Sequence, residues 1–385
     1  MAADARAAAL WALSRRRRDG VRLDAALNEA VKGLPPRDSA LATRLCYGVV
    51  QNGALIDLSL KEYVPKTQPQ VWDILRLGAY QLWYLDRVPH RALTDEAVRL
   101  CKKTAPHAAG LVNAVLRRLP GKPPETDDVS VKYSLPEWFC EKMAAILPPG
   151  ELEPFFASCN AVPPIYILGN LLRDMPESYI LTDPAELSGI LRDGRGIVAD
   201  PAAKKAVAAL DPQPGQRVWD TCAAPGGKTA MIAMAMRDEG YLLATDKGAG
   251  KLPMIGQTLS RLGVTIAEVK QADASSYWPG GLFDAVLCDV PCSGFGVLRK
   301  KPDIRYRTEV GHFPALQLAI LRNAAKAVKE GGTLVYCTCT LLPEENEGVV
   351  REFLTDDFVV ESMETLWPHK QDTDGFFICR MKKDN

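Results

Sequence analysis

Hydrophobic residues in the first third of the chain recur at the spacing of amphipathic helices. Apolar side chains three and four residues apart form one face of each segment, and Pro, Gly or Asp residues separate the segments. We expect helices over residues 5–13, 23–31, 39–50, 71–85, 93–102 and 110–119. Because strand-like alternation is almost absent, residues 1–120 are predicted to form an all-helical domain.

Two different kinds of segment follow this domain. Residues 119–128 are rich in proline and charge and lack apolar periodicity, which is typical of a linker. A helical pattern over 138–146 then precedes strand-like pieces at 164–170 and 179–182. Residues 129–200 are therefore expected to form a small α+β connector.

From residue 214 onward, short β-rich runs alternate with helical segments. Strands are predicted over residues 217–219, 241–244, 264–270, 283–288 and 332–337, and a helix over 229–237. This alternation favours an α/β domain, residues 201–385, built on a parallel, doubly wound sheet. Ligands of such sheets bind at the carboxyl ends of the strands, where this chain has acidic residues, cysteines and a Gly-rich loop.

Composition and charge point to a partner. With 385 residues, 47% of them hydrophobic and 24% charged, the chain is typical of a globular protein of two or three domains. Its 47 basic residues cancel its 47 acidic residues. Residues 1–120 nevertheless contain 19 Lys and Arg against 11 Asp and Glu, which leaves 28 against 36 for residues 121–385. A basic helical domain of this kind indicates a nucleic-acid partner.

The sequence does not indicate a membrane or secreted protein. No uninterrupted apolar stretch reaches the length of a membrane span, and the apolar run at 7–13 is followed, not preceded, by basic residues. The ten cysteines are scattered, and several lie inside apolar strand-like runs. We expect a protein of the reducing cytoplasm with no membrane partner, and a monomer is the simplest expectation.

The first chemical motif is DTCAAPGGKTA at residues 220–230, between a predicted strand and a helix. Its glycine pair lets the backbone approach a ligand, and the helix N-terminus favours an anionic or polar group. A phosphate-binding P-loop would need glycine where Cys222 stands, and the dinucleotide fingerprint is absent as well. A plain strand-to-helix turn remains the alternative.

Acidic residues follow at the ends of the next predicted strands. Asp246 suits a ribose diol, since a carboxylate accepts two hydroxyl hydrogen bonds, and Asp273 suits an adenine amino group. Asp289 ends the strand after that. Each aspartate alone is more typical of a cap or a turn, but three of them behind one Gly-rich loop favour a nucleoside site.

Two cysteine motifs complete the set: DVPCSGFG at residues 289–296 and YCTCTLLPEENE at residues 336–347. Cys288 and Cys337 lie within apolar strands and are interpreted as core residues. Cys292 and Cys339 lie beyond the strand ends, where nearby charge can activate a thiol as a nucleophile. A metal site is the minor alternative, because no C-x-x-C pair accompanies these cysteines and the chain has only four histidines.

In this order, the three motifs resemble those of the RNA cytosine-5 methyltransferases of the Sun (RsmB) type. CAAPGGKT resembles their cofactor loop, DVPCSG their Pro-Cys motif, TCTLLPEENE their Thr-Cys motif, and DGFFICRMKK at 374–383 their closing strand. Residues 5–119 resemble the NusB-type RNA-binding domain of members that act on small-subunit ribosomal RNA. The resemblance covers nearly the whole chain and is weakest over 121–195. It implies a Rossmann-like methyltransferase domain, preceded by an all-α NusB-like domain, that uses S-adenosylmethionine to methylate C5 of a cytosine in 16S rRNA.

The resemblance also implies roles for individual residues. Cys339 would add to C6 of the cytosine as a thiolate, Cys292 would assist release of the product, and Asp289 would stabilise or protonate the N3/N4 edge of the ring. The cofactor would contact the loop and the acidic strand ends: Cys222, Ala223, Ala224, Pro225, Gly226, Gly227, Lys228, Asp246, Asp273 and Asp289. Lys228 is expected to tie motifs together, Cys337 to be a bystander, and no metal to take part.

Three positions depart from the family pattern. Leu168 and Lys251 stand where arginine is common, and Ala199 stands where glutamine is common. These departures leave the roles of the connector and of the ribose-side contacts open.

RNA is expected to contact two basic segments: Arg15, Arg16, Arg17 and Arg18, then Arg299, Lys300, Lys301 and Arg305. A solvated helix face is the alternative for the first segment. The target cytosine has to be single-stranded or extruded, because its C6 is unreachable within a stacked helix.

Two other functions remain open from the sequence. The first is a related enzyme that acts on transfer RNA or on DNA; DNA cytosine methyltransferases attack with the Pro-Cys thiol, which would make Cys292 essential. The second is a non-catalytic RNA-binding factor for ribosome assembly. Against this second function, every expected chemical position of the motifs is filled.

Overall fold

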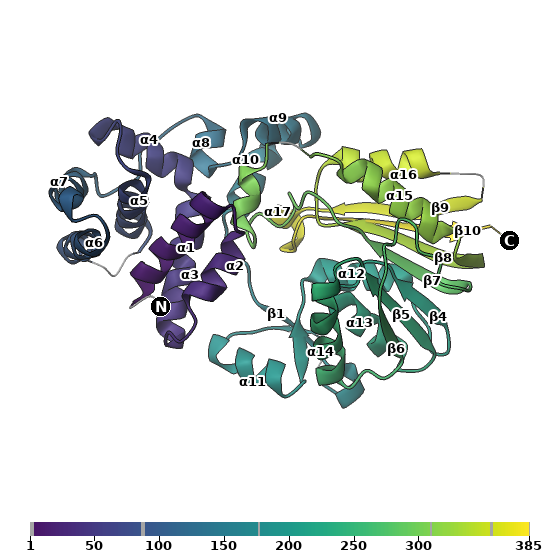
Figure 1. Cartoon of the computed structure of the whole chain (residues 1–385). Coiled ribbons are helices and arrows are strands. Elements are labelled where there is room, and N and C mark those ends of the chain that lie inside the picture. The colour runs from purple at the N-terminus through teal and green to yellow at the C-terminus, as the bar shows by residue number, and fades with distance from the viewer. Residues whose placement is uncertain (1–3, 86–88, 176–177, 309, 355–356, 385) are drawn as a thin grey trace. The chain divides into compact units, whose positions relative to one another are not determined.

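The computed structural model describes residues 4–85, 89–175, 178–308, 310–354 and 357–384. The chain forms two compact units, each shown in Figure 1. The helical unit consists of residues 1–161 and 298–308, and the sheet unit of residues 162–297 and 309–385. Residues 129–161 of the expected connector therefore group with the helical unit, and the rest of it groups with the sheet unit.

Helices fill the helical unit, as its apolar periodicity predicts. They are α1 (Ala5–Asp19), α2 (Leu23–Ala30), α3 (Pro36–Gln51), α4 (Gly53–Tyr63), α5 (Pro69–Tyr84), α6 (His90–Thr104), α7 (Ala109–Arg118), α8 (Val129–Tyr133), α9 (Glu137–Ile146) and α10 (Pro149–Ser158), with 3-10 turns η1 (Pro106–Ala108) and η5 (Pro302–Tyr306). Their apolar faces form a buried core that includes Leu45, Ile56 and Leu75. Sequence analysis did not predict α4, because the single residue Asn52 separates it from α3 and leaves no clear break in the pattern.

Local signals set the two ends of α1, the helix that carries the arginine run. At its start, the side chain of Asp4 accepts a hydrogen bond from the amide of Ala7 at 2.9 Å. At its end, Gly20 has a φ of 66° and donates its amide to the carbonyl of Arg16. The arginines occupy the last turn, where the helix dipole favours positive charge.

The sheet unit begins with a small antiparallel sheet. In the described residues it has the strand order β2-β1-β3, from β1 (Tyr166–Gly169), β2 (Tyr179–Ile180) and β3 (Gly196–Val198), with η2 (Leu171–Arg173), η3 (Pro184–Glu186) and α11 (Leu187–Arg192) between the strands. Asn170, which is fully buried, donates to the carbonyls of Gly194 and Leu262 at 2.9 Å each. Leu168, one of the departures from the family pattern, is a core residue.

The larger sheet has the strand order β6-β5-β4-β7-β8-β10-β9. Its strands are β4 (Arg217–Asp220), β5 (Tyr241–Asp246), β6 (Ala267–Gln271), β7 (Phe283–Asp289), β8 (Val328–Thr338), β9 (Phe358–Leu366) and β10 (Phe376–Lys383). Strands β4 to β8 pair in parallel, as predicted. Strand β10 pairs antiparallel with both β8 and β9. For β9 and β10 this follows because residues 367–375 between them are too few for a crossover connection.

Helices cover both faces of this sheet (Figure 1). They are α12 (Pro201–Leu210), α13 (Gly227–Ala235), α14 (Leu252–Leu262), α15 (Phe313–Ala325), α16 (Glu347–Phe353) and the short α17 (Pro368–Gln371), with 3-10 turns η4 (Ala249–Lys251) and η6 (Pro343–Glu345). Val218 and Leu242 pack with α12, α13 and α14, whereas Trp219 and Leu243 pack with α15 and α16. Both faces of the strands are therefore apolar, and the strand order changes direction at β4, where sheets of this class place ligands.

Candidate active site

Buried polar contacts hold the Gly-rich loop that follows β4. Thr229 Oγ1 on α13 donates to Asp220 Oδ2 at 2.7 Å, and burial raises the pKa of Asp220 to about 7. Gly226 has a φ of 100°, and an added Cβ would lie 3.1 Å from Ile255 Cα. At Gly227, an added Cβ would meet no described atom within 4 Å. The loop thus leaves space in front of the first turn of α13.

Asp246, at the end of β5, is joined to this loop. Its Oδ2 accepts from the amide of Ala224 at 3.3 Å, and its Oδ1 accepts from the amide of Gly248 at 2.9 Å. Lys251, another departure from the family pattern, places Nζ 3.3 Å from Asp246 Oδ1. The residue at position 251 therefore contacts the carboxylate that the sequence assigns to the ribose side.

Asp273 follows β6 and has its own set of donors. Its Oδ1 accepts from the amide of Ser275 at 3.0 Å and from the hydroxyl of Ser275 at 2.6 Å. Its Oδ2 lies 2.8 Å from Lys247 Nζ. The contacts with Lys247 and Ser275 lower the pKa of Asp273 to about 2, so this carboxylate is ionised at neutral pH.

Lys228 joins the Gly-rich loop to the Pro-Cys motif, and its Nζ lies 2.7 Å from Asp289 Oδ2. Burial disfavours the charge of Lys228, but the Asp289 carboxylate outweighs this effect and the pKa of Lys228 lies above its ordinary value. Asp289 Oδ1 accepts from the Cys337 thiol at 3.5 Å, and burial raises the pKa of that thiol well above its ordinary value. Asp289 is held between an ammonium and a thiol, so Cys337, which was expected to be a bystander, contacts a predicted site residue.

The cysteines of the two motifs meet at the carboxyl ends of β7 and β8. Cys292 Sγ lies 3.2 Å from Cys339 Sγ, and both are half-buried cysteines. The hydrogen bond with Cys339 and burial raise the pKa of Cys292 well above its ordinary value, and the Glu345 carboxylate adds to this effect. The protonated thiol is therefore the favoured form of Cys292 beside Cys339.

Backbone contacts fix the loops that carry these thiols. The amide of Gly296 donates to the carbonyl of Cys339 at 3.0 Å, and the amide of Gly375 donates to the carbonyl of Gly296 at 2.8 Å. The two glycines pack so closely that a Cβ added to Gly296 would lie 1.9 Å from the Gly375 oxygen. The loop after β7 is thereby tied to the loop after β8 and to the segment before β10.

Comparisons with known proteins identify the family of the chain. The profile of the family described as 16S rRNA methyltransferase RsmB/F matches residues 207–382, and the profile of the NusB family matches residues 3–120. The probable ribosomal RNA small subunit methyltransferase B of Bacillus subtilis is 32% identical, over 91% of this chain and 92% of that protein. The chain belongs to the RsmB/F methyltransferase family.

Two further similarities extend over most of the chain. The probable ribosomal RNA small subunit methyltransferase B of Synechocystis is 32% identical, over 94% of this chain and 95% of that protein. The crystal structure of PH0851 aligns with a TM-score of 0.80 at 26% identity and covers 100% of both chains. The predicted fold class of this RsmB/F protein, a NusB-like helical region with a Rossmann-like α/β domain, is confirmed.

Several residues that were not predicted as site residues contact the loops of the candidate site in this RsmB/F protein: Asp220, Thr338, Thr340, Glu345 and Asn346. Four of them lie within the Thr-Cys motif at residues 336–347, and Asp220 opens the first motif. The motifs therefore already contained these residues. The sequence does not show the direction in which each side chain points.

The arginines of α1 in this RsmB/F protein do not form one uniform basic face. Arg15 Nε lies 2.7 Å from Asp19 Oδ2, and the guanidinium of Arg16 lies 3.9 Å from the ring centre of Tyr306. Arg18 is exposed and makes no ion pair with the described residues. The predicted phosphate-binding run is thus partly engaged by its own chain.

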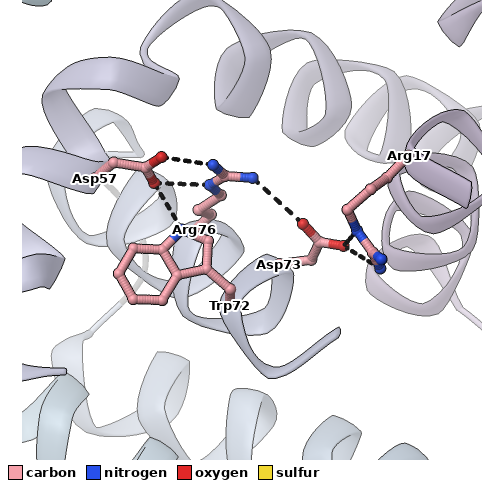
Figure 2. A network of polar contacts seen from close by, with 5 residues as sticks. All are labelled: Arg17, Asp57, Trp72, Asp73 and Arg76. Carbon is pink, nitrogen blue, oxygen red and sulfur yellow. Dashed lines mark hydrogen bonds and ion pairs between the residues drawn. The ribbon is translucent and has the colours of Figure 1, made fainter. Parts of the chain in front are cut away.

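Arg17 belongs to a polar network that links three helices (Figure 2). Its Nη2 lies 3.0 Å from Asp73 Oδ2, and the Asp73 side chain is only 4% exposed. Arg76 bridges the network, with Nη1 3.4 Å from Asp73 and Nε 2.7 Å from Asp57. Trp72 donates its indole N–H to Asp57 at 2.9 Å. Arg17 is therefore a structural partner for a buried carboxylate.

The second basic segment corrects part of the sequence prediction. Arg305 is 4% exposed, and its guanidinium donates to the carbonyl of Gln51 and to Asn160 Oδ1, each at 2.9 Å. Burial lowers the pKa of Arg305 to about 10. A buried guanidinium with its donors in use does not reach a phosphate, so the predicted RNA contact of Arg305 is wrong. Arg299 is equally buried.

Among the described residues, no helix combines the length and the apolar character that crossing a membrane requires. The same part of the chain has no group of three or more His, Cys, Asp or Glu side chains arranged to hold a metal ion.

Proposed function

We propose that this protein methylates C5 of a cytosine in 16S ribosomal RNA, in the cytoplasm, with S-adenosylmethionine as the methyl donor. The observation that carries the proposal is the 3.2 Å contact between the sulfur atoms of Cys292 and Cys339. It lies beside the Lys228–Asp289 pair on one edge of a Rossmann-like sheet. The relatives named small subunit methyltransferase B support the choice of RNA.

Cys339 starts the reaction, because C5 of cytosine is a weak nucleophile until a thiolate adds to C6. We assign the proton of the pair to Cys292, whose pKa is raised by the contact with Cys339 and by burial, and the charge to Cys339. The Cys339 sulfur forms a bond to C6, the electrons of the C5=C6 bond move toward N3, and C5 becomes enamine-like. Covalent addition thus divides one difficult step into two easier ones.

Asp289 and Lys228 face the charge that develops in the ring. We assign the contact with the N3/N4 edge of the cytosine to Asp289, and Lys228 Nζ, 2.7 Å from its carboxylate, keeps a positive charge beside it. After methyl transfer, C5 carries a proton that has to leave. Cys292 first loses its own proton to solvent, and we assign removal of the C5 proton to the resulting thiolate; the C5–H electrons re-form the C5=C6 bond, and the Cys339 sulfur departs with its bonding pair.

The residues on the acidic strand ends fit the proposed methyl donor. When bound, S-adenosylmethionine supplies an electrophilic methyl group on a sulfonium. The space in front of Gly227 and the first turn of α13 would admit its polar end. Asp246 would hold the ribose and Asp273 the adenine, and both carboxylates favour a cationic ligand.

The substrate is tested with small-subunit RNA from cells that lack this protein. Purified protein and S-adenosylmethionine with a tritiated methyl group should label that RNA and leave the same RNA from wild-type cells unlabelled. Bisulfite sequencing should then show a single protected cytosine. Labelling of transfer RNA alone would replace the proposed substrate with transfer RNA, and no labelling of any RNA would favour a non-catalytic assembly factor.

The helical unit is proposed to bind RNA phosphates through Arg15, Arg16, Arg18, Lys300 and Lys301. Arg18→Glu should weaken RNA binding and reduce the slope of log Kd against log salt by roughly 0.7 to 1, with unchanged thermal stability. Arg17→Glu should instead lower the free energy of unfolding by about 2 kcal/mol, because it places a second carboxylate beside buried Asp73. Filter binding at several salt concentrations and urea unfolding separate the two effects. Unchanged RNA affinity of the Arg18 variant would make the run a solvated face.

A further inference from the structure

Glu345, the last residue of η6, holds the loop that carries Cys292. It is fully buried, and its Oε2 accepts from the amide of Ser293 at 2.8 Å and from Gln317 Nε2 at 2.9 Å. Gln317, on α15, also donates to the carbonyl of Pro291 at 3.0 Å. The residues on both sides of Cys292 are thus fixed by one carboxylate and one amide.

Asn346, the next residue, holds the loop that carries Cys339. Its Oδ1 accepts from the hydroxyl of Thr338 at 2.6 Å, and its Nδ2 donates to the carbonyl of Thr340 at 3.0 Å. A hydrogen bond of 2.9 Å between the hydroxyls of Ser293 and Thr340 connects the two loops. Two consecutive residues therefore contact the flanks of both cysteines.

We propose that Glu345 and Asn346 are a positioning pair that sets the distance between the two thiols, and that the charge of Glu345 favours the protonated form of Cys292 throughout the reaction. A single peptide bond joins the pair, and the hydroxyl of Tyr336 on β8 donates to the Glu345 carbonyl at 2.6 Å. The link between the loops is therefore short and fixed to the sheet. This inference rests on the proposed function, since it assigns a part of that reaction.

Glu345 is suited to this electrostatic role because its charge is only partly neutralised. Its Oε1 is buried and accepts no hydrogen bond from the described residues. The titratable groups that act on Cys292 are Cys339 after β8, Tyr336 on β8 and Glu345 on η6. Tyr336 stays neutral, because burial raises its pKa far above the ordinary value. Once Cys339 has become a thioether, the Glu345 carboxylate still opposes ionisation of Cys292.

The experiment measures adduct formation and adduct decay in single turnovers at several pH values, with 16S rRNA from cells that lack the protein. Release requires the Cys292 thiolate, so its rate should rise with pH. Glu345→Gln keeps the acceptor for Ser293 but removes the charge. We expect the rate of adduct decay in this variant to begin rising at a lower pH. At pH values below the rise seen with the unchanged protein, the adduct of the variant should decay about tenfold faster.

A second variant tests positioning on the other loop. Thr338→Val keeps the shape of the side chain and removes its hydrogen bond to Asn346. We expect the adduct to form about tenfold more slowly, because Cys339 is misplaced. The pH dependence of adduct decay should not change, because the charge of Glu345 is retained. Glu347→Gln, in the same motif and half-buried, is the matched control and should behave like the unchanged protein.

The results separate failure of the inference from failure of the proposed function. If the unchanged protein forms an adduct but Glu345→Gln releases it with the same pH profile, the electrostatic role of Glu345 is overturned. If Thr338→Val forms the adduct at the normal rate, the positioning role of the pair is overturned. Absence of any adduct with the unchanged protein would count against the proposed function itself. Thermal melting of each variant shows that the fold is retained.

Discussion

Replacement of Cys339 by alanine is expected to abolish methyl transfer, with a loss of about 10⁴-fold or more in the rate. Without the thiolate, C5 of the cytosine is not activated, and no nucleophile attacks the methyl group of the donor. Cys339 is half-buried at a strand end, so removing its sulfur should leave the melting temperature nearly unchanged. The measurement is incorporation of tritiated methyl groups into 16S rRNA, with melting recorded on the same samples.

Cys140→Ala is the matched control for the Cys339 variant. Cys140 is also a half-buried free thiol, but it lies on α9 in the helical unit. This control should retain full activity. Turnover by Cys339→Ala at a normal rate would contradict the mechanism, and loss of activity on replacing Cys292 alone would then favour attack by the Pro-Cys thiol, as in DNA cytosine methyltransferases.

Replacement of Cys292 by alanine is expected to give the opposite defect. Cys339 can still add to C6 and the methyl group can still be transferred, but the base assigned to removal of the C5 proton is gone. A covalent protein–RNA adduct should therefore accumulate until most of the enzyme is trapped, and turnover should stop after about one cycle. The adduct is measured as a band of lower mobility on a denaturing gel and as RNA label that stays with the protein.

The double variant Cys292→Ala, Cys339→Ala is the control for this trap and should form no adduct. Two results would count against the assignment. Rapid product release by Cys292→Ala would mean that another group removes the proton. An adduct that persists in the double variant would mean that the bond to RNA does not involve Cys339.

The local pattern of hydrophobic and polar residues predicted many of the helices and strands. Val218 and Trp219 alternate between the two buried faces of the sheet, and their apolar neighbours made the strand recognisable without any tertiary contact. The same reasoning failed at α4, where one residue separates two helices, and at β10, whose antiparallel pairing depends on where the chain turns back. The pattern of hydrophobic and polar positions shows which faces of a helix or strand are apolar. The pairing of strands depends on segments that are distant in the sequence.

The contacts of the individual basic residues could not be predicted from the sequence. Arginine at positions 17 and 305 looks the same in the sequence as arginine at position 18. In the folded chain, Arg17 pairs with buried Asp73, and Arg305 donates to the carbonyls of Gln51 and Ser134 and to Asn160 Oδ1. A run of basic residues shows how many positive charges a segment carries, but it does not show what each side chain contacts. Burial and ion pairing depend on the packing around each side chain.

By itself, the sequence determined the family, the candidate site residues and the edge of the sheet on which they lie, since motifs at the ends of parallel strands must share one edge. Tertiary structure decided which of those residues meet. Cys292 and Cys339 are 47 residues apart in the chain, yet their sulfur atoms are 3.2 Å apart in the fold. The raised pKa of Cys292 comes from this contact, from burial and from the charge of Glu345. A pKa depends on neighbours and solvent in space, which residue order does not specify.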